Sequence, residues 1–332
     1  MYCFEVMSDA PTTNHPLVSV ICLCYNQAAY VQQALQSVLS QTYSAIELII
    51  ADDASTDGSR AIIERFAQDH PHIQLVLNDS NQGNCRTFNK ALALAKGKYV
   101  IDLAADDVLF NDRIEKQVAV FEQQGESCAL VYSNACLINE KGIEIGKYFA
   151  TNHHGKAIRQ VPTGEVYERL LWDDFICPPT TMFRKAILDQ LGGYDETLSY
   201  EDFDCWIRMA RDHTFAYLDD ITMLRRVVKN SWGQKPKIHL ASSFAICQKA
   251  FKLNRNQAEN HALSIRIRYF IRQCWLLHQF ELANDFGTLL RKVDSIDWFT
   301  KMVLVACQYR LPIRPLHVLY GSIQKQLSRK IM

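Results

Sequence analysis

Short apolar runs alternate with helical patterns throughout the N-terminal part of the chain. Residues 17–24 are apolar apart from Ser19, as expected of a strand buried on both faces. Val31, Leu35 and Val38 then recur at helical spacing, and the alternation continues with short connections. Because strands joined through helices run parallel, the pattern predicts an α/β protein with a mostly parallel central sheet flanked by helices.

The expected elements follow from the same periodicities. Strands are predicted at 17–24, 46–51, 73–77, 99–103, 129–133 and 181–183. Helices are predicted at 28–41, 58–68, 87–95, 113–123, 185–191 and 202–211. The segment Asn139-Glu140-Lys141-Gly142 is typical of a turn and predicts a hairpin around 138–145, whereas 146–179 show no regular pattern.

The chain length and a change of pattern predict three parts. A chain of 332 residues can hold one large α/β domain and a smaller appendage. We expect a disordered leader at 1–16, an α/β domain at 17–235 and a helical region at 236–332, because the pattern beyond 235 is helical. No run of about 20 mostly apolar residues is evident, so no transmembrane helix is predicted.

The charge of the chain is unevenly distributed, although its formal net charge is zero. Residues 241–332 contain 14 Lys/Arg and 5 Asp/Glu, a net charge of +9, so 1–240 carry −9. The basic part either faces phosphates or an anionic membrane surface, or is a solvated helical face. The odd number of cysteines, eleven, without a CxxC pair, does not suggest a disulfide framework, and a reducing cytoplasm is expected.

Three acidic signatures follow predicted strands or begin a predicted helix. They are Asp52-Asp53, Asp106-Asp107 and Glu201-Asp202. Because ligands of open α/β sheets bind at the carboxyl ends of the strands, the first two pairs are expected at one site. Clustered carboxylates repel each other and lose hydration, so they need a function or a cation. The chain is therefore predicted to be a metal-dependent enzyme acting on a nucleotide or phosphate ester.

Two of these signatures suggest chemistry, and each has a structural alternative. Asp106-Asp107 suits Mg²⁺ or Mn²⁺, which take one or two carboxylates together with substrate phosphates, but it also fits a capped turn. Asp102 is either a further ligand or a paired structural charge. Asp202 at a helix N-terminus would stay ionised and act as a general base, or would only cap the helix.

The ends of the first two strands offer groups for a nucleotide. Asp53 can accept a hydrogen bond from a base or a ribose, and the ring of Tyr25 can stack on a base. Alone, Tyr25-Asn26 after a strand is more typical of a turn than of a ligand site, and Asp52 with Ser55 is typical of a helix start. Their joint occurrence at one sheet edge favours a nucleotide site.

Other catalytic signatures are missing from the sequence. It contains no GxGxxG, Walker A, GxSxG or HExxH motif, which argues against dehydrogenases, P-loop NTPases, serine hydrolases and zinc proteases. It also contains no RNP or zinc-finger motif, so no nucleic-acid partner is expected.

A series of motifs runs in order from about residue 17 to 231. They are Val18-Ser19-Val20-Ile21, Tyr25-Asn26, Ser37-Val38-Leu39-Ser40-Gln41-Thr42-Tyr43, Glu47-Leu48-Ile49-Ile50, Asp52-Asp53-Ala54-Ser55-Thr56-Asp57-Gly58-Ser59, Asn81-Gln82-Gly83, Asn89, Lys96-Gly97-Lys98-Tyr99, Gly192-Gly193-Tyr194-Asp195-Glu196 and Glu201-Asp202-Phe203-Asp204-Cys205-Trp206-Ile207-Arg208. In this order they resemble the motifs of the inverting family 2 glycosyltransferases, of bacterial surface-polysaccharide type, with the nucleotide-diphospho-sugar (GT-A) fold.

The resemblance implies a GT-A domain at 17–235 that moves one sugar from a nucleotide-diphospho-sugar to a hydroxyl of a glycan or lipid-linked acceptor with inversion. By the resemblance alone, the expected base of the nucleotide is uridine. It implies Mn²⁺ or Mg²⁺ at Asp106 and Asp107, and Asp202 as catalytic base. The expected substrate-binding residues are Tyr25, Asn26, Asp53, Arg86, Asp106, Glu201 and Arg225. We expect a cytoplasmic enzyme that can lie on the inner face of the plasma membrane.

The chain also departs from the family pattern. Ala104 stands where the Asp-x-Asp-Asp motif has its first carboxylate, which leaves the number of metal ligands open. Arg225-Arg226 is not followed by the His of Arg-x-His, so either Arg225 or Arg226 is expected to contact phosphate instead. The processive Gln-x-x-Arg-Trp signature is missing, which favours single-sugar addition. Two alternatives remain: a degenerate scaffold protein, suggested by Ala104, and a sugar-phosphate nucleotidyltransferase, which normally has a Gly-rich N-terminal signature that this chain lacks.

Overall fold

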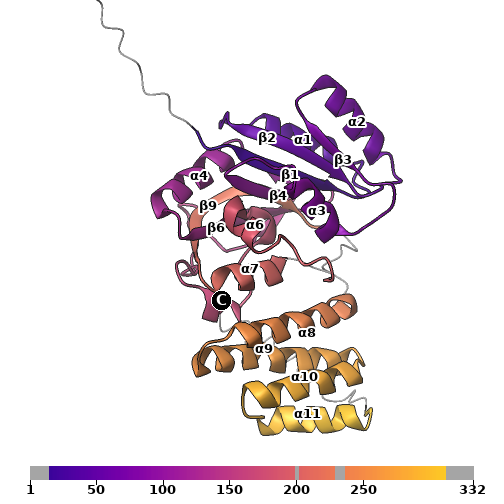
Figure 1. Cartoon of the computed structure of the whole chain (residues 1–332), viewed down its shortest axis with the longest axis vertical. Coiled ribbons are helices and arrows are strands. Elements are labelled where there is room, and N and C mark those ends of the chain that lie inside the picture. The colour runs from indigo at the N-terminus through magenta and orange to yellow at the C-terminus, as the bar shows by residue number, and fades with distance from the viewer. Residues whose placement is uncertain (1–14, 199–201, 229–235, 312–332) are drawn as a thin grey trace, which may run out of the picture. The chain divides into compact units, whose positions relative to one another are not determined.

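The computed structural model describes residues 15–198, 202–228 and 236–311 (Figure 1). The chain divides into two compact units, Met1–Val166 with Phe175–Lys229, and Tyr167–Asp174 with Asn230–Met332. The expected leader at 1–16 lies outside the described residues, apart from His15 and Pro16.

Within the described residues, the first unit is built on a nine-stranded sheet with the order β3-β2-β1-β4-β8-β6-β9-β5 and with β7 paired to β6. The strands are β1 (Val18–Cys24), β2 (Ile46–Asp52), β3 (Gln74–Leu77), β4 (Tyr99–Ala104), β5 (Val108–Leu109), β6 (Cys128–Ile138), β7 (Glu144–Lys147), β8 (Met182–Arg184) and β9 (Thr214–Arg226). All six predicted strands are present, and β6 and β7 form the predicted hairpin.

The first half of the sheet is parallel, as the alternating pattern predicts. β1 pairs in parallel with β2 on one side and β4 on the other, and β2 pairs with β3. In this register Cys24 lies opposite Asp52, and Leu23 lies opposite Ala104. Three strands therefore end at one edge, and the residues that follow them, including Tyr25 and Asp53, belong to the same edge.

The second half of the sheet is mixed. β8 is antiparallel to β4 and β6, β9 runs parallel to β6, and β5 is antiparallel to β9. No prediction covered β9, because Asp219-Asp220 interrupt its apolar pattern. The pairing of β6 with β9 jumps from Ser133–Leu218 to Asn134–Ile221, so the irregularity takes up the two aspartates.

The helices of the first unit lie close to their predicted positions. They are α1 (Val31–Leu39), α2 (Ser59–Asp69), α3 (Asn84–Leu92), α4 (Arg113–Gln124), α6 (Lys185–Gln190) and α7 (Asp202–Ala210), with a 3₁₀ turn η1 (Pro178–Thr180). The boundaries differ from the predictions by one to a few residues, as expected where a periodic pattern has no sharp cap.

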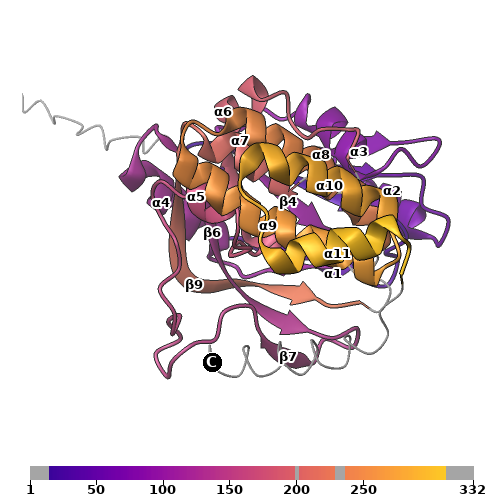
Figure 2. The same cartoon turned by 90° about the horizontal axis from the view of Figure 1, so that it is seen from below.

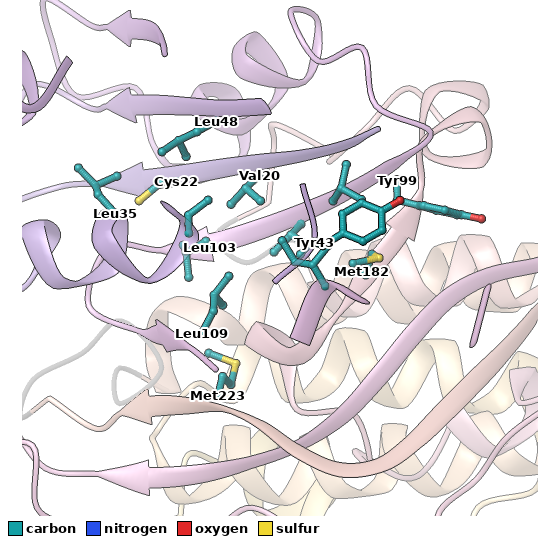
Figure 3. Close-up of a cluster of buried hydrophobic side chains, with 14 of the residues drawn as sticks. Val20, Cys22, Leu35, Tyr43, Leu48, Tyr99, Leu103, Leu109, Met182 and Met223 are labelled. Carbon is teal, nitrogen blue, oxygen red and sulfur yellow. The ribbon is translucent and has the colours of Figure 1, made fainter. Parts of the chain in front are cut away.

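β1 is buried on both faces, and one large core cluster lies on the face against α1. Alternate residues of β1 and β4, among them Val20, Cys22 and Leu103, are buried against helices such as α1, which contributes Leu35 (Figure 3). Cys22 and Cys24 are buried and belong to this core. Because successive side chains of a strand point to opposite faces, Asp102 lies on the other face of β4 from Leu103.

The second unit is helical. Its helices are α5 (Tyr167–Leu170), α8 (Pro236–Leu253), α9 (Gln257–Leu276), α10 (Phe280–Val293) and α11 (Trp298–Gln308). The buried Arg266 of α9 donates hydrogen bonds to the carbonyls of Leu170 and Leu171, which attaches the α5 segment to this unit. Among the described residues, no helix is long and apolar enough to cross a bilayer.

Candidate active site

Tyr25 and Asn26 lie in a turn that is held against the loop after β2. The backbone N–H of Asn26 donates to Ser55 Oγ at 2.9 Å, and its side-chain Oδ1 accepts from the backbone N–H of Thr56 at 2.8 Å. Asn26 has a positive φ of 55°, a conformation that Asn adopts more readily than most residues. The turn leaves 46% of Tyr25 exposed, so its ring is available to a ligand.

Asp53 is buried and its carboxylate organises the loop after β3. It accepts hydrogen bonds from Asn78 Nδ2 at 2.9 Å and from the backbone N–H groups of Gln82 and Gly83 at 2.8 and 2.9 Å. The neighbouring Asp52 is fully buried and accepts from the backbone N–H of Ser55 at 3.1 Å. These bonds bring the ends of β1, β2 and β3 together as one polar edge.

Asp106 and Asp107 follow β4 at the same end of the sheet. Burial raises the pKa of both carboxyl groups, and the charge of Asp106 raises that of Asp107 further. Burial, followed by nearby charges that include Asp102, Asp106 and Asp107, also raises the pKa of Cys22 on β1. Asp106 and Asp107 therefore repel each other in a largely buried turn, which favours a cation or a shared proton there.

Arg226 at the end of β9 holds the turn that contains Asp106 and Asp107, called here the acidic turn. Its backbone N–H donates to Asp107 Oδ1 at 2.7 Å, and its Nε donates to the Asp106 carbonyl at 3.0 Å. The same guanidinium donates to Gln33 on α1 at 3.0 Å and lies 4.4 Å from the ring of Tyr30. Arg226 is nearly buried and acts as a positioning residue, a role that the sequence did not distinguish from phosphate binding.

Arg225 points to the opposite side of β9 from Arg226, as neighbours on a strand do. It is half-buried, and its charge partly offsets the burial that raises the pKa values of Asp106 and Asp107. Its guanidinium lies 6.0 Å from the ring of Tyr148. The structure thus brings the predicted Arg225 to the acidic turn, from a strand that the sequence pattern did not reveal.

Asp102 is the carboxylate that the sequence left undecided. It accepts a hydrogen bond from Tyr194 Oη at 3.0 Å. Burial and then the charge of Asp202 raise its pKa to about 8, while the bond from Tyr194 opposes the shift. The coupling shows that Asp202 at the start of α7 lies near Asp102, and it makes Asp102 a protonated neighbour of the predicted base at neutral pH.

The segment that carries Asp202 toward β4 is attached to α3. Asn89 donates to the carbonyl of Tyr194 at 2.8 Å, and its Oδ1 accepts from the Tyr194 N–H at 2.9 Å. Gly193 has a φ of +72°, and a Cβ there would lie 2.4 Å from Asn89 Oδ1, so only glycine fits. The predicted Arg86 also lies on α3, where its Nε contacts Glu196 at 3.0 Å.

An ion pair between Arg208 and Asp204 holds the N-terminal part of α7, the helix that begins at Asp202. Arg208 contacts Asp204 at 2.7 Å and donates to the carbonyls of Leu191 and Gly193, both at 2.8 Å. These contacts fix the first turn of α7, where the dipole of the helix favours an ionised Asp202. The predicted Glu201 lies outside the described residues.

The residues at the acidic turn suit a divalent cation that is completed by a ligand. Asp106 and Asp107 supply oxygen donors, and their burial and mutual repulsion would be relieved by a cation. The described part of the chain holds no group of three or more His, Cys, Asp or Glu side chains that could bind a metal by itself. A substrate diphosphate and water would therefore have to complete the coordination.

A comparison with known protein families shows which family this chain belongs to. The family model described as Glycosyl transferase family 2 matches residues 19–192, about half of the chain and most of the described sheet. The chain belongs to glycosyl transferase family 2. It is therefore a glycosyltransferase, which confirms the family suggested by the ordered motifs.

Individual relatives in family 2 agree with this assignment. The chain is 30% identical over 217 residues to the putative teichuronic acid biosynthesis glycosyltransferase TuaG of Bacillus subtilis, a match that covers 65% of this chain and 81% of TuaG. It is 31% identical over 197 residues to the putative glycosyltransferase EpsE of the same organism, over 58% of this chain and 66% of EpsE.

Solved structures confirm the GT-A fold. TarS residues 1–349 of S. aureus, in complex with UDP-GlcNAc, has a TM-score of 0.66 at 18% identity and matches 89% of this chain and 88% of that chain. The mannosyltransferase PcManGT of Pyrobaculum calidifontis, in complex with GDP-Man and Mn²⁺, has a TM-score of 0.57 at 18% identity, over 92% and 84% of the two chains.

Proposed function

We propose that this family 2 glycosyltransferase transfers one sugar from a nucleotide-diphospho-sugar, with UDP as the carrier, to a hydroxyl group of a glycan or lipid-linked acceptor. The transfer inverts the anomeric configuration and serves polysaccharide biosynthesis in the cytoplasm. The observation that carries the proposal is the joint placement of Asp106, Asp107 and Arg225 at the sheet edge that also presents Tyr25. The name of TuaG and the UDP-GlcNAc complex of TarS support the substrate class.

The donor base and ribose occupy the edge formed by the first three strands. The exposed ring of Tyr25 stacks on the base, and Asn26 holds the turn that presents this ring. Asp53 already accepts hydrogen bonds from Asn78 and two backbone N–H groups, so its main contribution is to shape the loop against which the base lies. A nucleotide contact through its remaining lone pairs would add to this role.

The donor diphosphate lies at the acidic turn. Asp106 and Asp107 would hold Mn²⁺ or Mg²⁺, and Arg225 would contact a phosphate oxygen from the β9 side. A bound divalent cation would offset the negative charge that grows on the departing diphosphate. Arg226 keeps the turn in place, since its contacts reach both the Asp106 carbonyl and the Asp107 carboxylate.

Asp202 removes the proton from the acceptor hydroxyl as its oxygen attacks the anomeric carbon. In the same displacement, the bond between that carbon and the diphosphate oxygen breaks, and the nucleoside diphosphate leaves. The raised pKa of Asp102 lets it retain a proton beside Asp202 at neutral pH, which limits the repulsion that an ionised Asp202 would meet.

Calorimetric titration with UDP, dTDP and GDP, with and without Mn²⁺, tests the donor site. We expect one nucleotide, UDP, to bind in a metal-dependent manner to the wild-type protein and to lose this dependence in Asp106→Asn. The control Asp79→Asn changes an exposed aspartate and should bind as wild type does. Lack of binding by all three nucleotides would favour a degenerate scaffold, for which Ala104 is the supporting observation.

Replacing the proposed base separates binding from chemistry. Asp202→Asn should leave UDP affinity within about twofold but lower the transfer rate by at least about a hundredfold, since general-base catalysis contributes factors of this size. The measurement is product formation from a screened sugar nucleotide, with the anomeric configuration of the product read by NMR. Unchanged transfer would remove Asp202 from the mechanism, and a retained configuration would contradict single displacement.

A further inference from the structure

α11 is the terminal helix of the described helical stack, and it presents an apolar row on its outer face. α8, α9, α10 and α11 follow one another in the stack, with α11 in contact with α10 and α9 (Figures 1 and 2). The inner face of α11 is buried through Val303, Leu304 and Cys307. The last helix of such a stack normally has a polar outer face, because no further helix covers it.

The exposed row consists of large side chains at helical spacing. Trp298 is 73% exposed, Met302 48%, Val305 45% and Tyr309 69%, and these positions are separated by four, three and four residues. Residues at this spacing lie on one face of a helix. Single exposed apolar residues are ordinary, but a contiguous row that begins with Trp and ends with Tyr is typical of a binding surface.

The charged side chain within this row is Lys301, and Asp297 at the N-cap of α11 is paired with Arg268. Lys301 is exposed and lies one turn from both Trp298 and Val305 on the same face. The chain that follows α11, residues 312–332, contains four Lys/Arg and no Asp/Glu. A symmetric contact between two copies of this surface would bring like charges together, whereas an anionic surface would complement them.

We propose that the face of α11 formed by Trp298, Lys301, Met302, Val305 and Tyr309 docks on an anionic phospholipid membrane. The helix lies in the plane of the interface, with its apolar row among the acyl chains nearest the headgroups and Lys301 beside lipid phosphate. Trp and Tyr suit this depth, because their rings are apolar and their N–H and O–H groups reach water. This surface would retain the enzyme where a lipid-linked acceptor is found, but its binding to lipid does not depend on the proposed transfer reaction.

Vesicle co-sedimentation of the full chain tests the proposal. Vesicles of phosphatidylcholine and phosphatidylglycerol should retain the protein at low salt, and vesicles of phosphatidylcholine alone should retain much less. Trp298→Ala with Tyr309→Ala should weaken retention at least about tenfold, because both interfacial anchors are lost. Lys301→Gln should weaken it about fivefold and reduce its salt dependence.

Matched variants on the other unit control for general effects. Ile158→Ala removes a side chain that is 69% exposed, and Lys141→Gln removes an exposed charge, so both should sediment as wild type does. Far-UV circular dichroism and UDP binding confirm that each variant is folded. Equal retention of the Trp298/Tyr309 variant and the wild type, or no retention of the wild type by anionic vesicles, overturns the proposal. A dimer in sedimentation velocity that this double variant dissociates would identify the face as a contact between copies instead.

Discussion

Two acidic pairs lie at the ends of β2 and β4, the strands on either side of β1, but their surroundings differ. Asp53, directly after β2, is satisfied internally, since it accepts from Asn78 and from the backbone of Gln82 and Gly83, whereas Oδ1 of the buried Asp52 has no hydrogen-bond partner among the described residues. Asp106-Asp107 after β4 is buried with mutual repulsion, and its pKa values are raised. Asp53 stabilises a loop by accepting its hydrogen bonds. Asp106 and Asp107 instead repel each other, and a bound cation would reduce this repulsion.

The difference shows that an acidic pair after a strand does not by itself identify a metal site. Both pairs occupy the same position in the sequence pattern, and both lie at the carboxyl edge of the sheet. What distinguishes them is the supply of backbone N–H groups: the loop after β3 offers two to Asp53, whereas β9 offers one, from Arg226, to Asp107. The pair with fewer donors is the one at which we propose that a cation binds.

The largest effect is expected from Asp106→Asn. Removing one charge from the repelling pair should lower kcat/KM for transfer by at least about a hundredfold, because stabilisation of the leaving diphosphate is lost. The folded protein should be as stable as wild type or more so, since a buried repulsion is relieved. Steady-state kinetics and urea unfolding measure the two effects. A loss of activity accompanied by a loss of stability would make Asp106 a structural residue, like Asp53.

Asp53→Ala should give the opposite pattern. It leaves the N–H groups of Gln82 and Gly83 and the side chain of Asn78 without their acceptor, so we expect the free energy of unfolding to fall by about 3 kcal/mol. Urea unfolding provides the measurement, and Asp79→Ala, at an exposed position of the same loop, is the control. If Asp53→Ala keeps wild-type stability and loses only UDP binding, the comparison between the two pairs fails.

A smaller and pH-dependent effect is expected from Asp102→Asn. The folded pKa of Asp102 is about 8, above its ordinary value of 3.8, so its contribution to stability is complete below about pH 4 and is lost as pH rises to 8. An asparagine keeps an acceptor for Tyr194 Oη without this loss. The variant should therefore melt above wild type at pH 9, by an amount that shrinks toward pH 5. A difference that does not change with pH would show that Asp102 is ionised in the folded protein.

The parallel half of the sheet could be predicted because its signals are local. The apolar strand 17–24 and the helical spacing of Val31, Leu35 and Val38 are set by neighbouring residues, and parallel pairing follows from the connecting helices. β9 gave no such signal, since Asp219-Asp220 are accommodated only by a shift in its pairing with β6. A strand whose irregularity is resolved by its partner cannot be recognised from its own sequence.

The same division holds for the site. The positions of Tyr25, Asp53 and Asp106 at strand ends follow from the sequence pattern, because parallel strands end together. The roles of Arg225 and Arg226 do not follow from the sequence pattern, because the sequence does not show which of the two side chains faces the acidic turn. The position of β9 in the sheet decides this. The proximity of Asp102 to Asp202 likewise depends on how α3 and α7 hold the intervening segment.

The sequence alone determined the family, the parallel strands and the acidic residues at their ends, because these depend on residue type and short-range spacing. Only the tertiary structure decided which carboxylates accept several hydrogen bonds and which are buried with few donors beside a like charge. Burial and hydrogen-bond supply arise from contacts between segments far apart in the chain, such as Asp107 with Arg226 and Asp102 with Tyr194. Those contacts turn one of two similar acidic pairs into a loop anchor and leave the other to bind a ligand.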